Sequence, residues 1–474
     1  MAKRIVIVGS VIAAAAVLAG LGVLIWWLVT REVDKPFSVR RKYVFLPVTL
    51  IRRKLHSPLT ALLYFSVLEG EGIGDFDYTA AFTEIPLVGD VFWWFYPTIA
   101  IGNRYNRPLI LWLDGVTGVP PSLLANLGMI GPYDINFNIR QNSWINRYNL
   151  LFIDAPLGTG FSSPLTNDQI PKTAEENAEH LALTLESFYT VHEGYRDTPL
   201  YIFGQAHGAQ LALTLAAKLH QNETKHNLRG VVLGNAIISP ALAMTKLGFY
   251  LEELGYIDAN GRDAIENLSK ETTQLVQGED LEDAFDKFIS LGQFVNENAG
   301  ATAVNLGNIV QKLTREPTTG DLFGQRDYLR RVFKNTDLDI MNTDVATALG
   351  ISNVTYDSGR DAVIKAFKSS FMAPATDKVE YILQNTSLTV AIYNGNLDAV
   401  SNTPGQLEWV GNLKWTGMPA FLAAPRQSIV VNRLVEGYFR NGTRLQFFWV
   451  NAAGQSTPLD NPAALNSIIN RVVF

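Results

Sequence analysis

The most constraining feature of the chain is a glycine-flanked turn between a short apolar run and an apolar helix. The run Leu200–Phe203 has the length and composition of a strand buried on both faces. The turn Gly204-Gln205-Ala206-His207-Gly208 follows, and the alanine- and leucine-rich residues 209–219 predict a helix. Since glycine permits backbone conformations that other residues avoid, the two glycines allow a sharp reversal here. The segment therefore predicts a strand–turn–helix unit of an α/β protein.

In the α/β-hydrolase fold, this turn has the pattern G-x-S-x-G, and its serine is the nucleophile of a Ser, Asp, His triad in that chain order. Position 206 is alanine, and a methyl group cannot attack a carbonyl. All six histidines lie between residues 56 and 226, so no imidazole follows a late acidic residue. The chain has no cysteine, which excludes a thiolate nucleophile. These residues predict a hydrolase scaffold that has lost its triad chemistry.

Apolar runs and amphipathic segments alternate along the rest of the chain. Further strands are predicted at 91–95, 109–113, 150–153, 231–233, 388–393 and 445–450, with helices at 173–191 and 462–473. Short amphipathic helices fill 246–370, which indicates a helical cap inserted into the sheet. The predicted fold is an α/β-hydrolase with a mostly parallel sheet and helices on both faces. The predicted regions are an anchor (1–30), a juxtamembrane linker (31–75), a first core part (76–245), the cap (246–372) and a second core part (373–474).

Residues 5–29 form an almost entirely apolar stretch near the N-terminus, with Ser10 as its only clearly polar side chain. As a helix it would reach roughly 37 Å, which is enough to cross a bilayer. Trp26 and Trp27 fall where an interfacial aromatic belt lies. A cleaved signal peptide is the competing interpretation, but the apolar core is long for one. We therefore expect a retained single-pass transmembrane helix that lies in the lipid bilayer.

Charge and composition narrow the compartment and the partners. Basic residues are more numerous after the apolar stretch than before it, which favours the large domain on the cytosolic or matrix side. The lack of cysteine agrees with this side, and the mitochondrial inner membrane is favoured over a secretory-pathway membrane. Five N-x-S/T sequons do not establish glycosylation. The net charge of −6 argues against a nucleic-acid partner.

Two further segments have a composition that bears on binding. Residues 43–66 are read as a linker packed on the domain, or as a segment at the membrane surface with basic side chains near lipid phosphates. The acidic run 279–285 lacks the spacing and glycine turn of a cation-binding loop, so it reads as a solvated helix face. No metal ion or cofactor is predicted.

Six ordered blocks resemble the serine carboxypeptidase family, close to its vitellogenic-like branch. They read PLILWLDG, GPYDINFN…NSW, NLLFIDAPLGTGFS, PLYIFGQAHGAQ, VAIYNGNLDAVSNTPG…W and LDNPAALNSIINRVV, and the similarity covers roughly residues 76–474. The resemblance implies an α/β-hydrolase with a helical cap. It places the family's nucleophilic serine on Ala206, its triad aspartate on Asp398 and its triad histidine on Gln455. Glutamine does not act as a base near neutral pH.

The resemblance also implies changes at the positions that bind substrate. The family's N-G-G-P-G loop, which supplies oxyanion and carboxylate contacts, reads Asp114-Gly115-Val116-Thr117-Gly118. Asp114 is expected to repel a peptide carboxylate, and Val116 to crowd the approach of the substrate to the backbone. The family's elbow glutamate falls on Gln205, and a second glutamate falls on Met129. The family's cysteines are absent.

These residues predict a serine carboxypeptidase-like pseudoenzyme, not an enzyme, that acts as a membrane-anchored accessory subunit with other membrane proteins as partners. The alternative is a binding module that holds a ligand or peptide in the former pocket through Asp398, Gln455, Gln205 and His207. A residual hydrolase that uses His207 as an improvised base is a third hypothesis, and it lacks an identified nucleophile.

Overall fold

The computed structural model describes residues 42–50, 59–68, 72–116, 119–222, 226–300, 304–312, 338–357 and 359–474. The anchor predicted at 5–29 lies outside these ranges. Within them, no helix combines the length and apolar composition needed to cross a bilayer.

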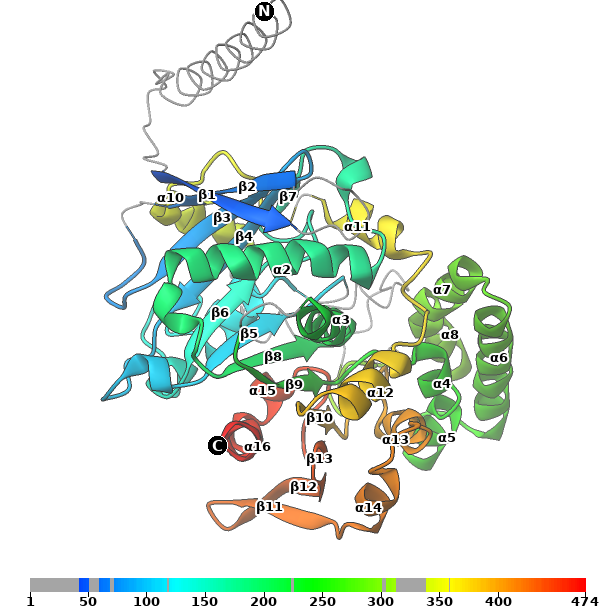
Figure 1. The fold of residues 1–474 in the computed structure, drawn as a ribbon. Helices are drawn as coiled ribbons and strands as arrows, with labels where there is room; N and C mark the ends of the chain where they lie inside the picture. Colours follow the sequence, from blue (N-terminus) through cyan, green and yellow to red (C-terminus); the bar gives the residue numbers. More distant parts are fainter. Residues whose placement is uncertain are drawn as a thin grey trace, which may run out of the picture. The chain divides into compact units, whose positions relative to one another are not determined.

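One twisted sheet runs through the described part of the chain, in the order β1-β2-β3-β4-β6-β5-β8-β9-β10-β13-β12-β11, with β7 paired to β4 (Figure 1). The strand bounds are β1 (Lys42–Leu50), β2 (Leu59–Val67), β3 (Thr79–Ile85), β4 (Gly89–Tyr96), β5 (Leu109–Leu113), β6 (Asn149–Ile153), β7 (Ser163–Pro164), β8 (Leu200–Gln205), β9 (Leu228–Gly234), β10 (Thr389–Gly395), β11 (Gln427–Val431), β12 (Leu434–Gly442) and β13 (Leu445–Val450).

The sheet is mixed rather than mostly parallel, which corrects the prediction. Strands β6, β5, β8, β9, β10 and β13 are parallel neighbours in the centre. On one side, β1 to β4 pair antiparallel and β4 joins β6 antiparallel; on the other, β11, β12 and β13 pair antiparallel. An apolar run buried on both faces has the same composition in either direction, so composition could not reveal the antiparallel ends.

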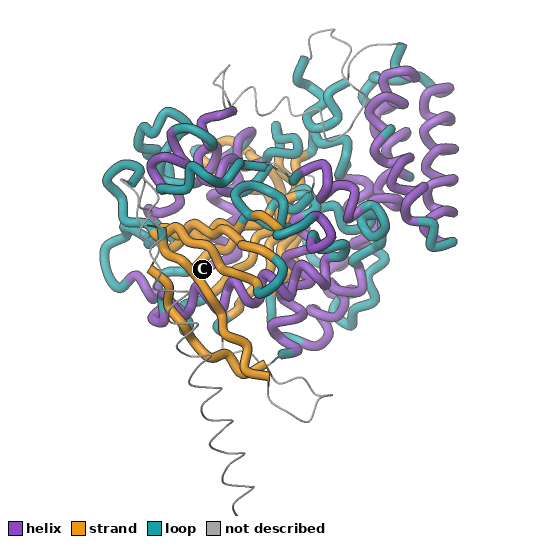
Figure 2. The backbone as a smooth tube through the Cα atoms, turned by 90° about the horizontal axis from the view of Figure 1, so that it is seen from above, coloured by secondary structure: helices purple, strands orange, loops and turns teal. Residues whose placement is uncertain are grey.

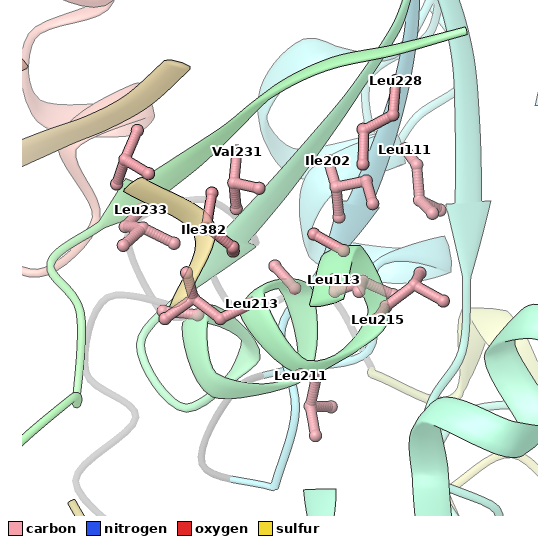
Figure 3. Packing of buried hydrophobic residues seen from close by; sticks show 14 of the residues in the cluster. Leu111, Leu113, Ile202, Leu211, Leu213, Leu215, Leu228, Val231, Leu233 and Ile382 are labelled. Carbon is pink, nitrogen blue, oxygen red and sulfur yellow. The ribbon is translucent and has the colours of Figure 1, made fainter. Parts of the chain in front are cut away.

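Helices cover both faces of the sheet, as predicted. Helices α2 (Ala174–Val191), α3 (Gly208–Gln221) and α12 (Thr376–Asn385) pack on one face, where leucine, isoleucine and valine side chains of β5, β8 and β9 meet α3 (Figure 3). On the other face the π-helical segment η2 (Ser122–Ile130) and α16 (Pro462–Val473) pack over the alternate side chains of the same strands. Side chains alternate between faces along a strand, so each central strand contributes to both cores.

Most of the predicted cap region that the structure describes is helical, and residues 304–312 are an exception. Helices α5 to α8 gather beside the sheet domain (Figures 1 and 2). The remaining bounds are α4 (Pro240–Met244), α5 (Leu247–Glu253), α6 (Ala259–Gln277), α7 (Leu281–Ile289), α8 (Leu291–Asn298), α10 (Asp344–Leu349), α11 (Arg360–Phe367), α13 (Thr403–Gly411), α14 (Met418–Ala423), α15 (Thr457–Asp460), η1 (Arg104–Asn106), η3 (Trp144–Asn146), η4 (Asn167–Gln169), η5 (Glu193–Tyr195) and η6 (Leu338–Met341).

The segment 31–75, predicted as a linker, contains two strands of the sheet. Strand β1 pairs with β2 from Lys42↔Val67 to Leu50↔Leu59, and β2 continues the sheet onto β3. Whether such a segment forms a strand depends on its pairing with a neighbouring strand, and local composition does not reveal that pairing.

Candidate functional site

The turn after β8 has the strained geometry of a nucleophile elbow. Ala206 adopts a φ of 51°, in the left-handed region that side chains rarely occupy. The two glycines are required because a Cβ on Gly204 would lie 2.3 Å from the Gly208 carbonyl oxygen, and one on Gly208 would lie 2.3 Å from that of Leu113. The Ala206 amide donates to the Gly234 carbonyl at 3.0 Å, and its carbonyl accepts from the Ile237 amide at 3.0 Å. The backbone of the elbow is therefore intact around a methyl group.

The strand order brings together the three positions that align with the family's triad. Strands β8, β9, β10 and β13 are parallel neighbours, so their carboxyl ends meet at one edge of the sheet. Ala206, Asp398 and Gln455 lie just beyond three of these ends. Asn235, after β9, links Asp398 to the loop that carries Gln455, because its Nδ2 donates to Asp398 Oδ2 at 2.9 Å and to the Gly454 carbonyl at 3.2 Å.

Asp398 is buried, and its carboxylate is fully engaged by groups outside the predicted triad. Oδ1 accepts the amides of Val400 and Ser401 at 2.9 and 3.1 Å, while Oδ2 accepts Asn235 Nδ2 and the Ser401 hydroxyl. Burial raises the pKa of Asp398 to about 6, against the opposing effect of these hydrogen bonds. Its carboxylate holds the turn after β10 and the end of β9 in place.

The two glutamines are joined directly. Gln205 Nε2 donates to the main-chain carbonyl of Gln455, and Gln205 Oε1 accepts the Tyr393 hydroxyl at 2.9 Å. The Gln455 amide donates to the Gly307 carbonyl at 2.7 Å. A carboxylate at position 205 could accept from Tyr393 but could not donate to the Gln455 carbonyl, so the glutamine suits this bridge.

His207 is buried against aromatic side chains of the cap region. Its ring stacks on Phe371 at 4.9 Å between centroids and meets Phe367 edge-on at 5.4 Å. The Val116 amide donates to its Nδ1 at 3.4 Å, and burial lowers the pKa of His207 to about 3. An imidazole with so low a pKa is a weak base, so the geometry gives no support to the hypothesis of His207 as an improvised base.

The loop after β5 is built into the core. Trp112 Nε1 donates to Asp114 Oδ2 at 3.0 Å, and burial raises the pKa of the Asp114 carboxyl well above its usual range. The expected repulsion of a peptide carboxylate by Asp114 stays a prediction. Gly115 has a φ of 72°, and a Cβ there would lie 2.7 Å from the Gly208 amide nitrogen. Val116 packs with Ile170, Val363 and Phe367, while residues 117 and 118 lie outside the described ranges.

Met129, on η2, lies in the hydrophobic cluster on one face of the sheet, where it is 8% exposed. The sequence reasoning did not identify Asn235, Tyr393 and Ser401, which bond to the predicted site residues. Asn235 and Tyr393 could have been identified from the sequence, because each lies at or near the carboxyl end of a central strand. In the described ranges, no group of three histidine or carboxylate side chains is arranged to hold a metal ion.

Comparison with known proteins identifies the family. The family profile described as serine carboxypeptidase matches residues 86–474. The chain is 27% identical to rat (Rattus norvegicus) retinoid-inducible serine carboxypeptidase, over 78% of this chain and 85% of that protein. It is 26% identical to serine carboxypeptidase-like 51 of Arabidopsis thaliana (82% and 91% covered) and 28% identical to the venom serine carboxypeptidase of Apis mellifera (81% and 80%).

The same fold is seen in a crystal structure of Kex1Δp, a prohormone-processing carboxypeptidase from Saccharomyces cerevisiae. The TM-score is 0.68 at 20% sequence identity, and the match covers 85% of this chain and 94% of that one. This similarity confirms the predicted α/β-hydrolase fold.

The similarity contradicts the prediction that the chain is not an enzyme. The relatives at 26–28% identity are named serine carboxypeptidases, and none of the comparisons shows a loss of activity. The prediction inferred the loss of activity from substitutions at the positions aligned with the triad and with the family's substrate-binding residues. Substituted positions alone do not establish inactivity, because a serine hydrolase that lacks a triad member still keeps about 10³–10⁴-fold catalysis over water, from its oxyanion hole and substrate binding.

Three independent observations now agree. The elbow retains its left-handed turn, the carboxyl ends of the central strands gather the aligned positions, and the family profile spans most of the chain. The chain belongs to the serine carboxypeptidase family.

Proposed function

We propose that this member of the family acts as an accessory subunit of a membrane protein assembly and offers its α/β domain for protein contacts. The observation that carries the proposal is that the side chains of Asp398 and Gln205 are bonded to neighbouring groups of the protein. Asp398 is held by Asn235 and Ser401, and Gln205 bridges Tyr393 and the Gln455 carbonyl. The site thereby contributes to the stability of the fold, which suits a domain that acts through its surface.

The membrane part of the proposal rests on residues 5–29. Their length and apolar composition fit a bilayer-spanning helix, and the basic residues that follow favour the domain on the cytosolic or matrix side. In this arrangement, the domain stays close to the membrane, where other subunits of an assembly lie.

A surface for such contacts is available at the end of the β11–β12 hairpin. Val430, Leu434 and Val435 are 53%, 64% and 49% exposed, although turn regions usually carry polar side chains. Val430 and Val435 are opposite each other in the hairpin, and Arg433 stands in the turn between the strands. This combination of apolar and basic side chains suits a protein partner with an apolar surface and an acidic rim.

The test is recovery of the full chain from its native membranes in mild detergent. We expect one or more membrane proteins to be recovered in a fixed ratio, and the double substitution Leu434→Asp/Val435→Asp to release them. Leu87→Asp is the matched control, because Leu87 is 86% exposed at a different turn. Recovery without any stoichiometric partner contradicts the subunit role, whereas a partner retained by the hairpin variant excludes only this surface. A carboxypeptidase assay on the same preparation measures the activity for which the relatives are named.

A further inference from the structure

We infer that residues 304–312, here called the strap, form an internal closure that controls access to the elbow. The strap belongs to the cap region and crosses the loops that follow β10 and β13. Nothing in the family resemblance or in the comparisons assigns it a role. The inference concerns access only, so it does not depend on the proposed accessory function.

Backbone hydrogen bonds fix the strap across both loops. The Ala399 amide donates to the Leu306 carbonyl at 2.8 Å, and the Ile309 amide donates to the Leu397 carbonyl at 3.0 Å. The Gln455 amide donates to the Gly307 carbonyl at 2.7 Å. The strap is therefore bonded on both sides of Asp398 and to the residue aligned with the triad histidine.

Close packing accompanies these bonds. A Cβ on Gly454 would lie 2.2 Å from the Gly307 carbonyl oxygen and 2.6 Å from Asn308 Cβ, so the strap and the 454–455 loop approach each other at backbone distance. Three strap side chains, Val304, Leu306 and Ile309, are buried in the hydrophobic cluster that contains Ala206. Ala206 is left 2% exposed.

Two side chains from the cap helices and the turn between them bond to the strap. The Tyr256 hydroxyl donates to the Ile309 carbonyl, and Asn296 Oδ1 accepts the Val304 amide at 2.8 Å. The strap is thus held from the cap on one side and from the site loops on the other. Polar bonds of this kind can be lost and regained without unfolding the sheet, since local opening costs less than global unfolding.

The absence of cysteine makes the closure directly measurable. The substitution Ala206→Cys introduces the chain's single thiol at the elbow, and its rate of alkylation by a small maleimide reports access. Leu87→Cys supplies the rate of an open position, since Leu87 is 86% exposed. Ala212→Cys, on α3 and 0% exposed, supplies the rate that requires unfolding.

We expect the thiol of full-length A206C to react at least about ten-fold more slowly than that of L87C. Adding Tyr256→Phe or Asn296→Ala should raise the A206C rate about three- to ten-fold, because each removes one hydrogen bond that holds the strap. Neither should change the rate of A212C. Tyr250→Phe is the matched control and should leave the A206C rate unchanged, since the Tyr250 hydroxyl donates to the Asn396 carbonyl and not to the strap.

Three results would overturn the inference. The first is an A206C rate equal to that of L87C, which would mean an open site. The second is an A206C rate unchanged by both strap variants. The third is an equal increase in A206C and A212C, which would mean that the strap bonds support the whole fold rather than a local closure.

Discussion

At the scale of single residues, Asp398 shows how the site is integrated into the fold. Four donors reach its carboxylate, and two of them are main-chain amides. Removing a buried acceptor leaves these donors without a partner, and each unsatisfied group costs about 1–3 kcal/mol. We therefore expect Asp398→Ala to lower the free energy of unfolding by about 3–5 kcal/mol, as measured by urea denaturation. A loss as small as that from Asp75→Ala, at an exposed loop residue, would contradict this role.

His207 gives a prediction for pH. Burial lowers the pKa of His207 to about 3, whereas an unfolded histidine titrates near pH 6.5. Between these values the unfolded chain binds a proton that the folded chain does not, so stability is full above about pH 6.5 and falls as the pH is lowered.

Replacing this histidine with glutamine should remove that contribution, which reaches about 1.4 kcal/mol per pH unit. The measurement is the unfolding free energy of His207→Gln and of the unsubstituted chain at several values between pH 4 and 6.5. Burial also raises the pKa of Asp154 to about 7, which gives a slope of opposite sign, so only the difference between the two proteins isolates His207. Equal slopes in both proteins, or the same change in the exposed-site control His220→Gln, would refute the assignment.

At the scale of elements, helix α2 begins with a side-chain cap. The Thr173 hydroxyl accepts the Glu176 amide at 3.1 Å, and Glu175 and Glu176 lie in the first turn, where negative charge is favourable. We expect Thr173→Ala to lower the free energy of unfolding by about 1 kcal/mol in a chemical denaturation experiment. Thr166→Ala is the matched control, because Thr166 precedes η4 without a side-chain cap and should change stability by less than about 0.5 kcal/mol. Equal effects would argue against the cap.

The elements that sequence could predict are those with a local signal. The elbow, the central strands and the helices α2 and α16 were predicted from apolar runs, glycines and helical periodicity. The direction of β4, the β1–β2 hairpin and the β11–β12 hairpin were not, because strand pairing depends on contacts between segments distant in sequence.

The same distinction between local and long-range signals decides which parts of the candidate site the sequence could predict. Its positions could be found because they follow consecutive strands of the sheet, and the family resemblance aligned them in order. The partner Ser401 and the strap could not, since their role is defined by three-dimensional proximity. The bond from the indole of Trp112 to Asp114 was likewise not predicted from sequence.

At the scale of the whole molecule, the family fold is retained while the polar groups at its site bond internally. Asp398 and Gln205 bond the segments after the central strands to one another, and the strap bonds these segments to the cap region. A domain stabilised in this way presents an ordered surface, and the N-terminal apolar stretch would hold that surface near a membrane.

The most direct test of the accessory role is the mass of the particle that contains this chain in mild detergent, measured by light scattering with the detergent contribution subtracted. We predict a protein mass well above the 52.4 kDa of one chain, with other proteins present in a fixed ratio. A protein mass equal to that of a single chain would contradict the account.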